Sequence, residues 1–208
     1  MKRSRSSTTR SGSIYRNKQL GFQQLGDHPS PISSEQPAVL QIVGYKNSGK
    51  TTLICALIPL LQKKGYTVAV IKHDAHSFEI DHEGTDTWRQ REAGSSAVAI
   101  TGGARTVRIE ERGSSLAELV ASFSGYDFIL VEGFKNEAYP KIVLIQQEED
   151  LELLKKLNNI WAAGIWAPMR NAVTLEVPKG FMQYDINDVP TIASHLCQQR
   201  SYFQNFII

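Results

Sequence analysis

Short apolar runs of strand length recur along the chain, separated by stretches long enough to form helices. The strands predicted from these runs are 39–43, 67–71, 126–131, 141–145 and 160–166. The segments between and after them predict helices at 53–64, 87–93, 115–123, 151–157 and 189–198. Strands that alternate with helices favour a mostly parallel sheet with right-handed crossover connections. We therefore expect a three-layer α/β domain.

One segment departs from this alternation. Residues 97–101 and 105–110 flank Gly102 and Gly103, which predicts a β-hairpin on a two-residue glycine turn. Its apolar residues follow a period of two and are Val98, Ile100, Val107 and Ile109. A two-stranded ribbon is marginal in water. This excursion therefore needs a covering surface, either its own domain or a second copy of the chain.

Several residues indicate where helices bend or begin. Pro59 lies inside the first predicted helix and should kink it. Ser114 is a plausible N-cap for the helix at 115–123. The segment 185–188 caps the last helix, which has Pro190 in its first turn. The residues after the late apolar strand, Ala167 and Pro168, predict a loop.

The connection from the first strand to the first helix carries the strongest functional signal. Residues 44–51 fit G-x-x-x-x-G-K-[ST], the phosphate-binding loop, in its required strand–loop–helix context. Backbone N–H groups and the helix N-terminus of such a loop face a polyphosphate. Lys50 adds charge at the β- and γ-phosphates, and Thr51 offers a hydroxyl to Mg²⁺. The predicted nucleotide-binding residues of this loop are Gly44, Asn47, Ser48, Gly49, Lys50, Thr51 and Thr52.

Carboxylates at strand ends complete this predicted site. Glu132 ends a very apolar strand, where a P-loop protein places its second metal ligand, so Thr51 and Glu132 are the predicted Mg²⁺ residues. Gly133 follows and can offer its N–H to the terminal phosphate. Asp74 ends the neighbouring strand and could hold the metal or orient water. The predicted catalytic residues are Lys50, Glu132 and Asp74.

A polar cluster follows the second strand. His73, His76 and His82 could indicate a metal site, but their spacing is not that of a helical zinc pair and they lack cysteine partners. Lining of an anion pocket is the favoured interpretation. Asp81, Asp86 and Arg91 extend this predicted substrate-binding segment; the alternative is a solvated helix face.

Composition and charge divide the 208 residues into two parts. Residues 1–37 hold six of the 23 Lys and Arg and two of the 21 Asp and Glu, and we expect a disordered, Ser/Arg-rich tail. The nucleotide-binding domain is expected at 38–200. It shows no basic stripe, so no nucleic-acid partner is expected. No apolar stretch approaches the roughly 18 residues of a membrane span.

The two cysteines, Cys55 and Cys197, predict buried thiols of a reducing compartment. We therefore expect a cytoplasmic protein.

Further segments carry a family resemblance. These segments are 71–76, Asp81, Gly84, 86–87, 91–94, 129–135, 141–144 and 185–189. Through them, residues 38–198 resemble the MobB family. This resemblance implies a GTP-binding adaptor of molybdopterin guanine dinucleotide biosynthesis in bacteria and archaea, related to dimeric P-loop GTPases of the signal-recognition and MinD-like class. It also implies GTP and Mg²⁺ as cofactors, slow GTPase activity, a homodimer, and help to the guanylyltransferase that makes the dinucleotide. Molybdopterin or its guanine dinucleotide is the implied second ligand, near His73, His76, Asp81, Asp86 and Arg91.

Some residues differ from the family pattern. Ala75 stands where relatives carry a histidine, and Ile165-Trp166 stands where relatives carry Ser-Asp. Tyr45 replaces the lysine of the signal-recognition class, and no Asn-Lys-x-Asp follows the phosphate loop. Guanine preference is therefore implied by the resemblance alone.

Three functions of different classes fit these observations. The first is a slow GTPase that acts as an adaptor in molybdenum cofactor maturation. The second is a small-molecule kinase, which would show a substrate-dependent burst of nucleoside diphosphate. The third is a nucleotide-dependent binding module without hydrolysis.

Overall fold

The computed structural model describes residues 36–74, 78–177 and 180–206. The predicted tail, 1–37, lies outside the described residues except for its last two positions. All described residues belong to one compact unit that spans Pro31–Ile208.

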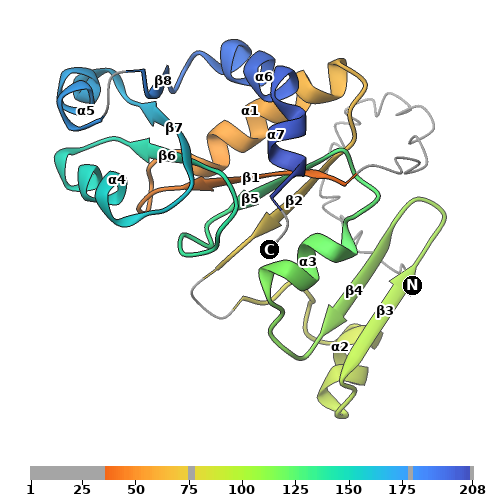
Figure 1. The fold of residues 1–208 in the computed structure, drawn as a ribbon. Coiled ribbons are helices and arrows are strands. Elements are labelled where there is room, and N and C mark those ends of the chain that lie inside the picture. The colour runs from red at the N-terminus through yellow and green to blue at the C-terminus, as the bar shows by residue number, and fades with distance from the viewer. Residues whose placement is uncertain (1–35, 75–77, 178–179, 207–208) are drawn as a thin grey trace, which may run out of the picture. The chain divides into compact units, whose positions relative to one another are not determined.

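A six-stranded sheet forms the centre of this unit (Figure 1). Its strands, in spatial order, are β2 (Val68–Lys72), β5 (Phe128–Glu132), β1 (Ala38–Val43), β6 (Lys141–Ile145), β7 (Ile160–Ile165) and β8 (Met182–Asp185). Every neighbouring pair is parallel. All residues of β1, β5 and β6 are buried, which explains why these central strands are continuous apolar runs in the sequence.

Helices cover both faces of the sheet, as the sequence predicted (Figure 1). On one face, side chains of α1 (Lys50–Lys63), α6 (Val189–Gln198) and α7 (Arg200–Gln204) form the largest core cluster with the sheet. On the other face, α3 (Leu116–Ser122) packs against β1, β2 and β5. The helices α4 (Glu152–Lys156) and α5 (Arg170–Glu176) cover β6 and β7 there. The three-layer prediction is confirmed.

The predicted hairpin forms a separate two-stranded sheet, outside the main one in Figure 1. Its strands are β3 (Ala97–Thr101) and β4 (Thr106–Glu110), and α2 (Asp86–Glu92) lies beside them. Val98 pairs with Ile109 and Ile100 with Val107, so the four apolar side chains share one face. Val98 is buried, whereas Ile100 is 56% exposed.

Several local predictions were wrong. The first helix begins at Lys50, not at Leu53. Pro59 lies inside this helix, and the kink there stays a prediction. The N-cap of α3 is Ser115, not Ser114, in a capping box with Glu118. Cys55 is exposed and Cys197 only half-buried, so the two are not fully buried thiols.

Some elements were not predicted at all. They are β8, α5, α7 and two short 3₁₀ turns, Glu148–Leu151 and Ala167–Met169. Within the part of the chain that the structure describes, no helix is long and apolar enough to cross a membrane.

Candidate nucleotide-binding site

The backbone of the phosphate loop, residues 44–51, is tightly wound between β1 and α1. Asn47 and Gly49 have left-handed φ angles of 64° and 96°. A Cβ at Gly44 would lie 2.5 Å from the Ser48 Oγ, and one at Gly49 would lie 3.2 Å from the Trp166 ring. Space therefore disfavours a side chain at Gly44, and the left-handed φ disfavours one at Gly49, where the contact would also be tight. Ser48 itself is buried beneath the loop.

Lys50 lies over the loop that precedes it. Its Nζ donates to the carbonyl oxygens of Gly44 at 3.2 Å and Tyr45 at 2.7 Å. Burial lowers the pKa of Lys50, and the nearby Glu132 carboxylate opposes that shift. Lys50 thus supplies a partly desolvated cation at the start of α1, where the helix N-terminus also favours negative charge.

The hydroxyl of Thr51 lies against the carboxylate of Glu132, as the metal-site prediction requires. Thr51 Oγ1 is 2.9 Å from both Glu132 carboxylate oxygens, so it can donate to either. Glu132 is the last residue of β5, is only 7% exposed, and pairs across the sheet with Ile42 of β1. Parallel strands place their carboxyl ends at one edge, so the phosphate loop and Glu132 meet although they are 81 residues apart.

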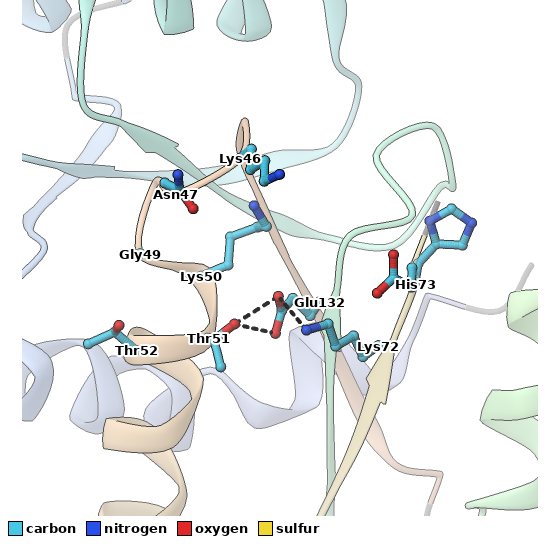
Figure 2. A pocket seen from close by; sticks show the side chains of 10 residues that line it. Lys46, Asn47, Gly49, Lys50, Thr51, Thr52, Lys72, His73 and Glu132 are labelled. Atoms are coloured by element: carbon cyan, nitrogen blue, oxygen red, sulfur yellow. Dashed lines mark hydrogen bonds and ion pairs between the residues drawn. The ribbon is translucent and has the colours of Figure 1, made fainter. Parts of the chain in front are cut away.

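These residues line a cleft of about 720 Å³ (Figure 2). Its lining residues are Lys46, Asn47, Gly49, Lys50, Thr51, Thr52, Lys72, His73, Asp74 and Glu132. Three lysines face two carboxylates, a balance that suits a polyphosphate with a divalent cation. The sequence analysis did not assign Lys46 and Lys72 to the site. Lys72 ends β2 and its Nζ lies 3.8 Å from the Glu132 carboxylate.

A hydroxyl and a carboxylate are hard oxygen ligands, as Mg²⁺ requires. Thr51 and Glu132 therefore fit such an ion. Among the described residues, no group of three or more His, Cys, Asp or Glu side chains is arranged to hold a metal. His73 is part of the cleft, and its ring lies 4.7 Å from that of Phe134. His76 lies outside the described residues.

The N–H of Gly133 is hydrogen-bonded within the sheet. Its N–H donates to the Ile42 carbonyl at 3.1 Å, so that group is not directed at a phosphate in this structure. Its φ is 94°, and a Cβ there would lie 3.3 Å from the His73 Cβ. Gly133 therefore serves a sharp turn and a close approach to His73.

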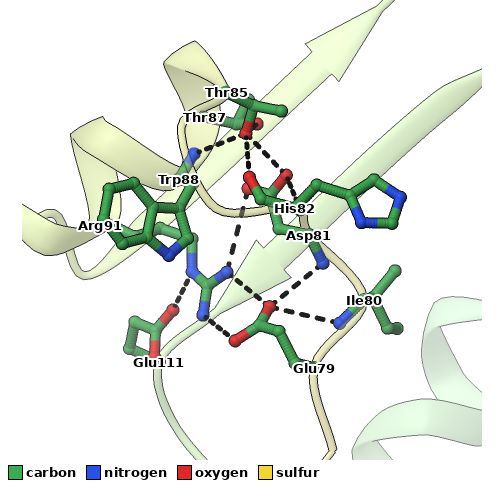
Figure 3. A network of polar contacts seen from close by, with 9 residues as sticks. All are labelled: Glu79, Ile80, Asp81, His82, Thr85, Thr87, Trp88, Arg91 and Glu111. Atoms are coloured by element: carbon green, nitrogen blue, oxygen red, sulfur yellow. Dashed lines mark hydrogen bonds and ion pairs between the residues drawn. The ribbon is translucent and has the colours of Figure 1, made fainter.

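The remaining predicted substrate residues lie away from the cleft. Arg91 is held by carboxylates of Glu79 at 2.8 Å, Glu111 at 2.5 Å and Asp81 at 3.8 Å (Figure 3). The hydrogen bonds that Arg91 donates to Glu79 and Glu111 raise the pKa of Arg91. Asp86 begins α2. This network joins the loop at 79–81 to α2 and to the end of the hairpin, and does not converge with Lys50 and Glu132.

Two aromatic residues connect the phosphate loop to the rest of the domain. The Trp166 indole N–H donates to the Ser48 carbonyl at 3.1 Å, and its ring lies against Gly49. The Tyr45 hydroxyl donates to the Glu152 carboxylate of α4. Neither contact was predicted, because each joins segments more than 100 residues apart.

Comparison with known proteins identifies the family. Residues 39–165 match the family model described as molybdopterin guanine dinucleotide synthesis protein B, or MobB. The chain belongs to the MobB family. It is 38% identical over 167 residues to the molybdopterin-guanine dinucleotide biosynthesis adapter protein of Haemophilus influenzae, covering 78% of this chain and 89% of that protein.

Solved MobB structures share this fold. The crystal structure of Bacillus subtilis MobB superposes with a TM-score of 0.63 at 28% identity, covering 78% of this chain and 97% of that one. The MobB homologue of Bacillus stearothermophilus gives a TM-score of 0.61 at 29% identity, covering 79% and 99%. Family membership assigns the chain an adapter function in molybdopterin guanine dinucleotide biosynthesis.

Proposed function

We propose that this MobB protein binds GTP with Mg²⁺, hydrolyses it slowly, and in doing so assists the guanylyltransferase of molybdopterin guanine dinucleotide biosynthesis. The observation that carries the proposal is the contact of the Thr51 hydroxyl with the Glu132 carboxylate, 2.9 Å apart in the cleft that Lys50 lines. That contact joins the two halves of a metal–nucleotide site. The preference for guanine rests on family membership.

The chain's own groups have distinct roles in this proposal. Backbone N–H groups of the loop and the start of α1 bind phosphate oxygens. Lys50 exchanges its two carbonyl acceptors for phosphate oxygens, which are stronger partners for an ammonium group. Thr51 and Glu132 would hold Mg²⁺, which when bound neutralises charge on the phosphates. Asp74, which also lines the cleft, would orient the attacking water.

Titration with GTP, ATP and molybdopterin tests the proposal. Wild-type protein should prefer GTP in the presence of Mg²⁺. Lys50→Ala should lose between roughly tenfold and a hundredfold in GTP affinity, because charge-assisted contacts contribute about 1.5–3 kcal/mol each. The circular dichroism spectrum should not change, since Lys50 packs over the loop and not in the core. If Lys50→Ala bound GTP and ATP with the same affinities as wild type, the assignment of the phosphate site would be overturned.

Kinetics separate the alternatives. A GTPase adapter releases phosphate slowly and without an acceptor. A kinase would show a burst of nucleoside diphosphate only when its acceptor is added, and a non-hydrolysing module would release no phosphate at all.

We further propose that an anionic second ligand, molybdopterin or its guanine dinucleotide, binds the segment from His73 to Arg91. His73 is the best-placed residue, because it lines the cleft beside Asp74. Arg91 is already neutralised by three carboxylates, so its contribution should be smaller. Molybdopterin affinity should therefore fall more in His73→Ala than in Arg91→Ala. Wild-type affinity in both variants would move this site elsewhere.

The proposal includes a homodimer that uses the hairpin, whose Ile100 is exposed. A cytoplasmic location and the roles of His76, Asp81 and Asp86 stay predictions.

A further inference from the structure

The turn after Glu132 is strained. Gly133 and Phe134 have consecutive left-handed φ angles of 94° and 53°. Glycine adopts this conformation readily, but phenylalanine does so at a cost in free energy. Such a residue persists only where its surroundings hold it, and residues of this kind gather at functional sites.

Two buried polar side chains hold this turn. Gln41, at the centre of β1 and 0% exposed, donates its amide to the carbonyl oxygens of Gly133 at 3.1 Å and Phe134 at 2.6 Å. Lys141 of β6, only 1% exposed, donates to the carbonyl oxygens of Glu137 and, at 2.8 Å, Tyr139. Burying these polar groups is unfavourable unless they are hydrogen-bonded. These hydrogen bonds offset the cost of burying Gln41 and Lys141, and they fix the backbone of the segment 133–139.

The turn brings Lys135 to the Tyr45 side chain, near the start of the phosphate loop. The Lys135 Nζ lies 4.8 Å from the centroid of the Tyr45 ring. Tyr45 also accepts the hydrogen bond from Lys50 through its carbonyl, so one loop residue holds both lysines. Besides the three lysines that line the cleft, a fourth therefore lies beside a residue of the phosphate loop.

We propose that Lys135 is a further phosphate-binding residue, specific for a nucleoside triphosphate, and that Gln41 is the positioning residue for its turn. This inference rests on the proposed nucleotide-binding function. In the structure, Lys135 rests on the Tyr45 ring, and its four-carbon stem lets the ammonium reach a neighbouring anion. A terminal phosphate attracts an ammonium more strongly than an aromatic face does. A diphosphate lacks that group and leaves Lys135 on Tyr45.

The test compares the affinities for a non-hydrolysable GTP analogue and for GDP, both with Mg²⁺. Lys135→Gln should bind the triphosphate analogue about tenfold more weakly, as expected for one lost charged contact, and should keep its GDP affinity. Lys135→Arg should recover most of the loss, because it restores the charge. Gln41→Met should reduce the triphosphate affinity selectively. Lys63→Gln, at the far exposed end of α1, is the matched control and should match wild type.

The outcomes separate this inference from the proposed function. A Lys135→Gln variant with the wild-type ratio of triphosphate to diphosphate affinity overturns the inference, and so does an equal loss for both nucleotides. If Lys135→Gln keeps the wild-type ratio while Lys50→Ala loses affinity for both nucleotides, the proposed function stands and only the Lys135 role fails. If wild-type protein binds neither nucleotide, both fail. If Gln41→Met does not fold, Lys135→Gln and Lys135→Arg still decide the question.

Discussion

The proposed hydrolysis depends on one pair of residues, Thr51 and Glu132. Glu132→Gln keeps the shape of the side chain and an oxygen that accepts from Thr51, but removes the charge. Mg²⁺-dependent phosphate release should fall by roughly a hundredfold, since charge stabilisation in the transition state is lost. GTP affinity should change much less, because Lys50 and the loop N–H groups remain.

Steady-state phosphate release with and without Mg²⁺ measures this effect. Glu83→Gln, an exposed carboxylate outside the cleft, is a suitable control. Wild-type turnover in Glu132→Gln would make Glu132 a structural residue at the end of a strand.

Lys141 should make stability depend on pH. Burial lowers the pKa of Lys141 from its usual 10.5 to about 8. Between these values the unfolded chain binds a proton that the folded chain has released, so the free energy of unfolding should rise with pH from 8 to 10.5. A neutral amine keeps two N–H donors, so both carbonyl contacts survive.

Urea unfolding across this window, in wild type and Lys141→Met, provides the measurement. Lys50 contributes a rise of the same sign, because its pKa is lowered too. The contribution of Lys141 is therefore the amount by which the pH-dependent rise in the free energy of unfolding is smaller in Lys141→Met than in wild type. A Lys141→Met variant with the same increase as wild type would contradict the assignment to Lys141.

Among the elements, α3 depends most visibly on its cap. The Ser115 side chain accepts from the Glu118 N–H, and Glu118 accepts from the Ser115 N–H in return. Ser115→Ala should lower the free energy of unfolding by about 1 kcal/mol. Ser114→Ala, one residue earlier, should have almost no effect. Chemical denaturation of both variants tests this, and equal losses would mean that the cap is not at Ser115.

The central strands that the sequence predicted share one property, which is a largely apolar run. β1, β5 and β6 are buried on both faces, and such strands are visible in a sequence. β8 was missed because Met182–Asp185 is an edge strand in which only Tyr184 is buried. The cap at Ser115 had a signal that was not used, since Glu118 follows it with the spacing of a capping box.

The site was predictable to the extent that sheet topology determines it. A phosphate loop and a strand-end carboxylate must meet at the carboxyl edge of a parallel sheet, so Lys50, Thr51 and Glu132 could be combined in advance. The carboxylates that bind Arg91 could not be predicted in this way. Glu79 lies in a loop and Glu111 follows the hairpin, so their approach to Arg91 depends on how those segments pack.

At the scale of the whole molecule, the described part of the domain covers only part of the apolar face of the hairpin. Val98 is buried and Ile109 is half-buried, so the domain covers one end of the apolar face. Ile100, on the same face, is 56% exposed. This exposed apolar surface supports the proposed dimer. A two-fold axis would pair the exposed ends of the two hairpins in one self-complementary interface.

Charged substitutions on the two faces of the ribbon test the dimer. Ile100→Glu, alone or with a charged residue at Ile109, should give folded monomers that still bind GTP, because the cleft is formed by other elements. Ala99→Glu places the same charge on the opposite face, across from Arg108, and should leave the dimer intact. Light scattering at micromolar concentration should give the mass of two chains for wild type and Ala99→Glu, and of one chain for Ile100→Glu. A wild-type monomer would reject the dimer, and a dimeric Ile100→Glu would place its interface on another surface.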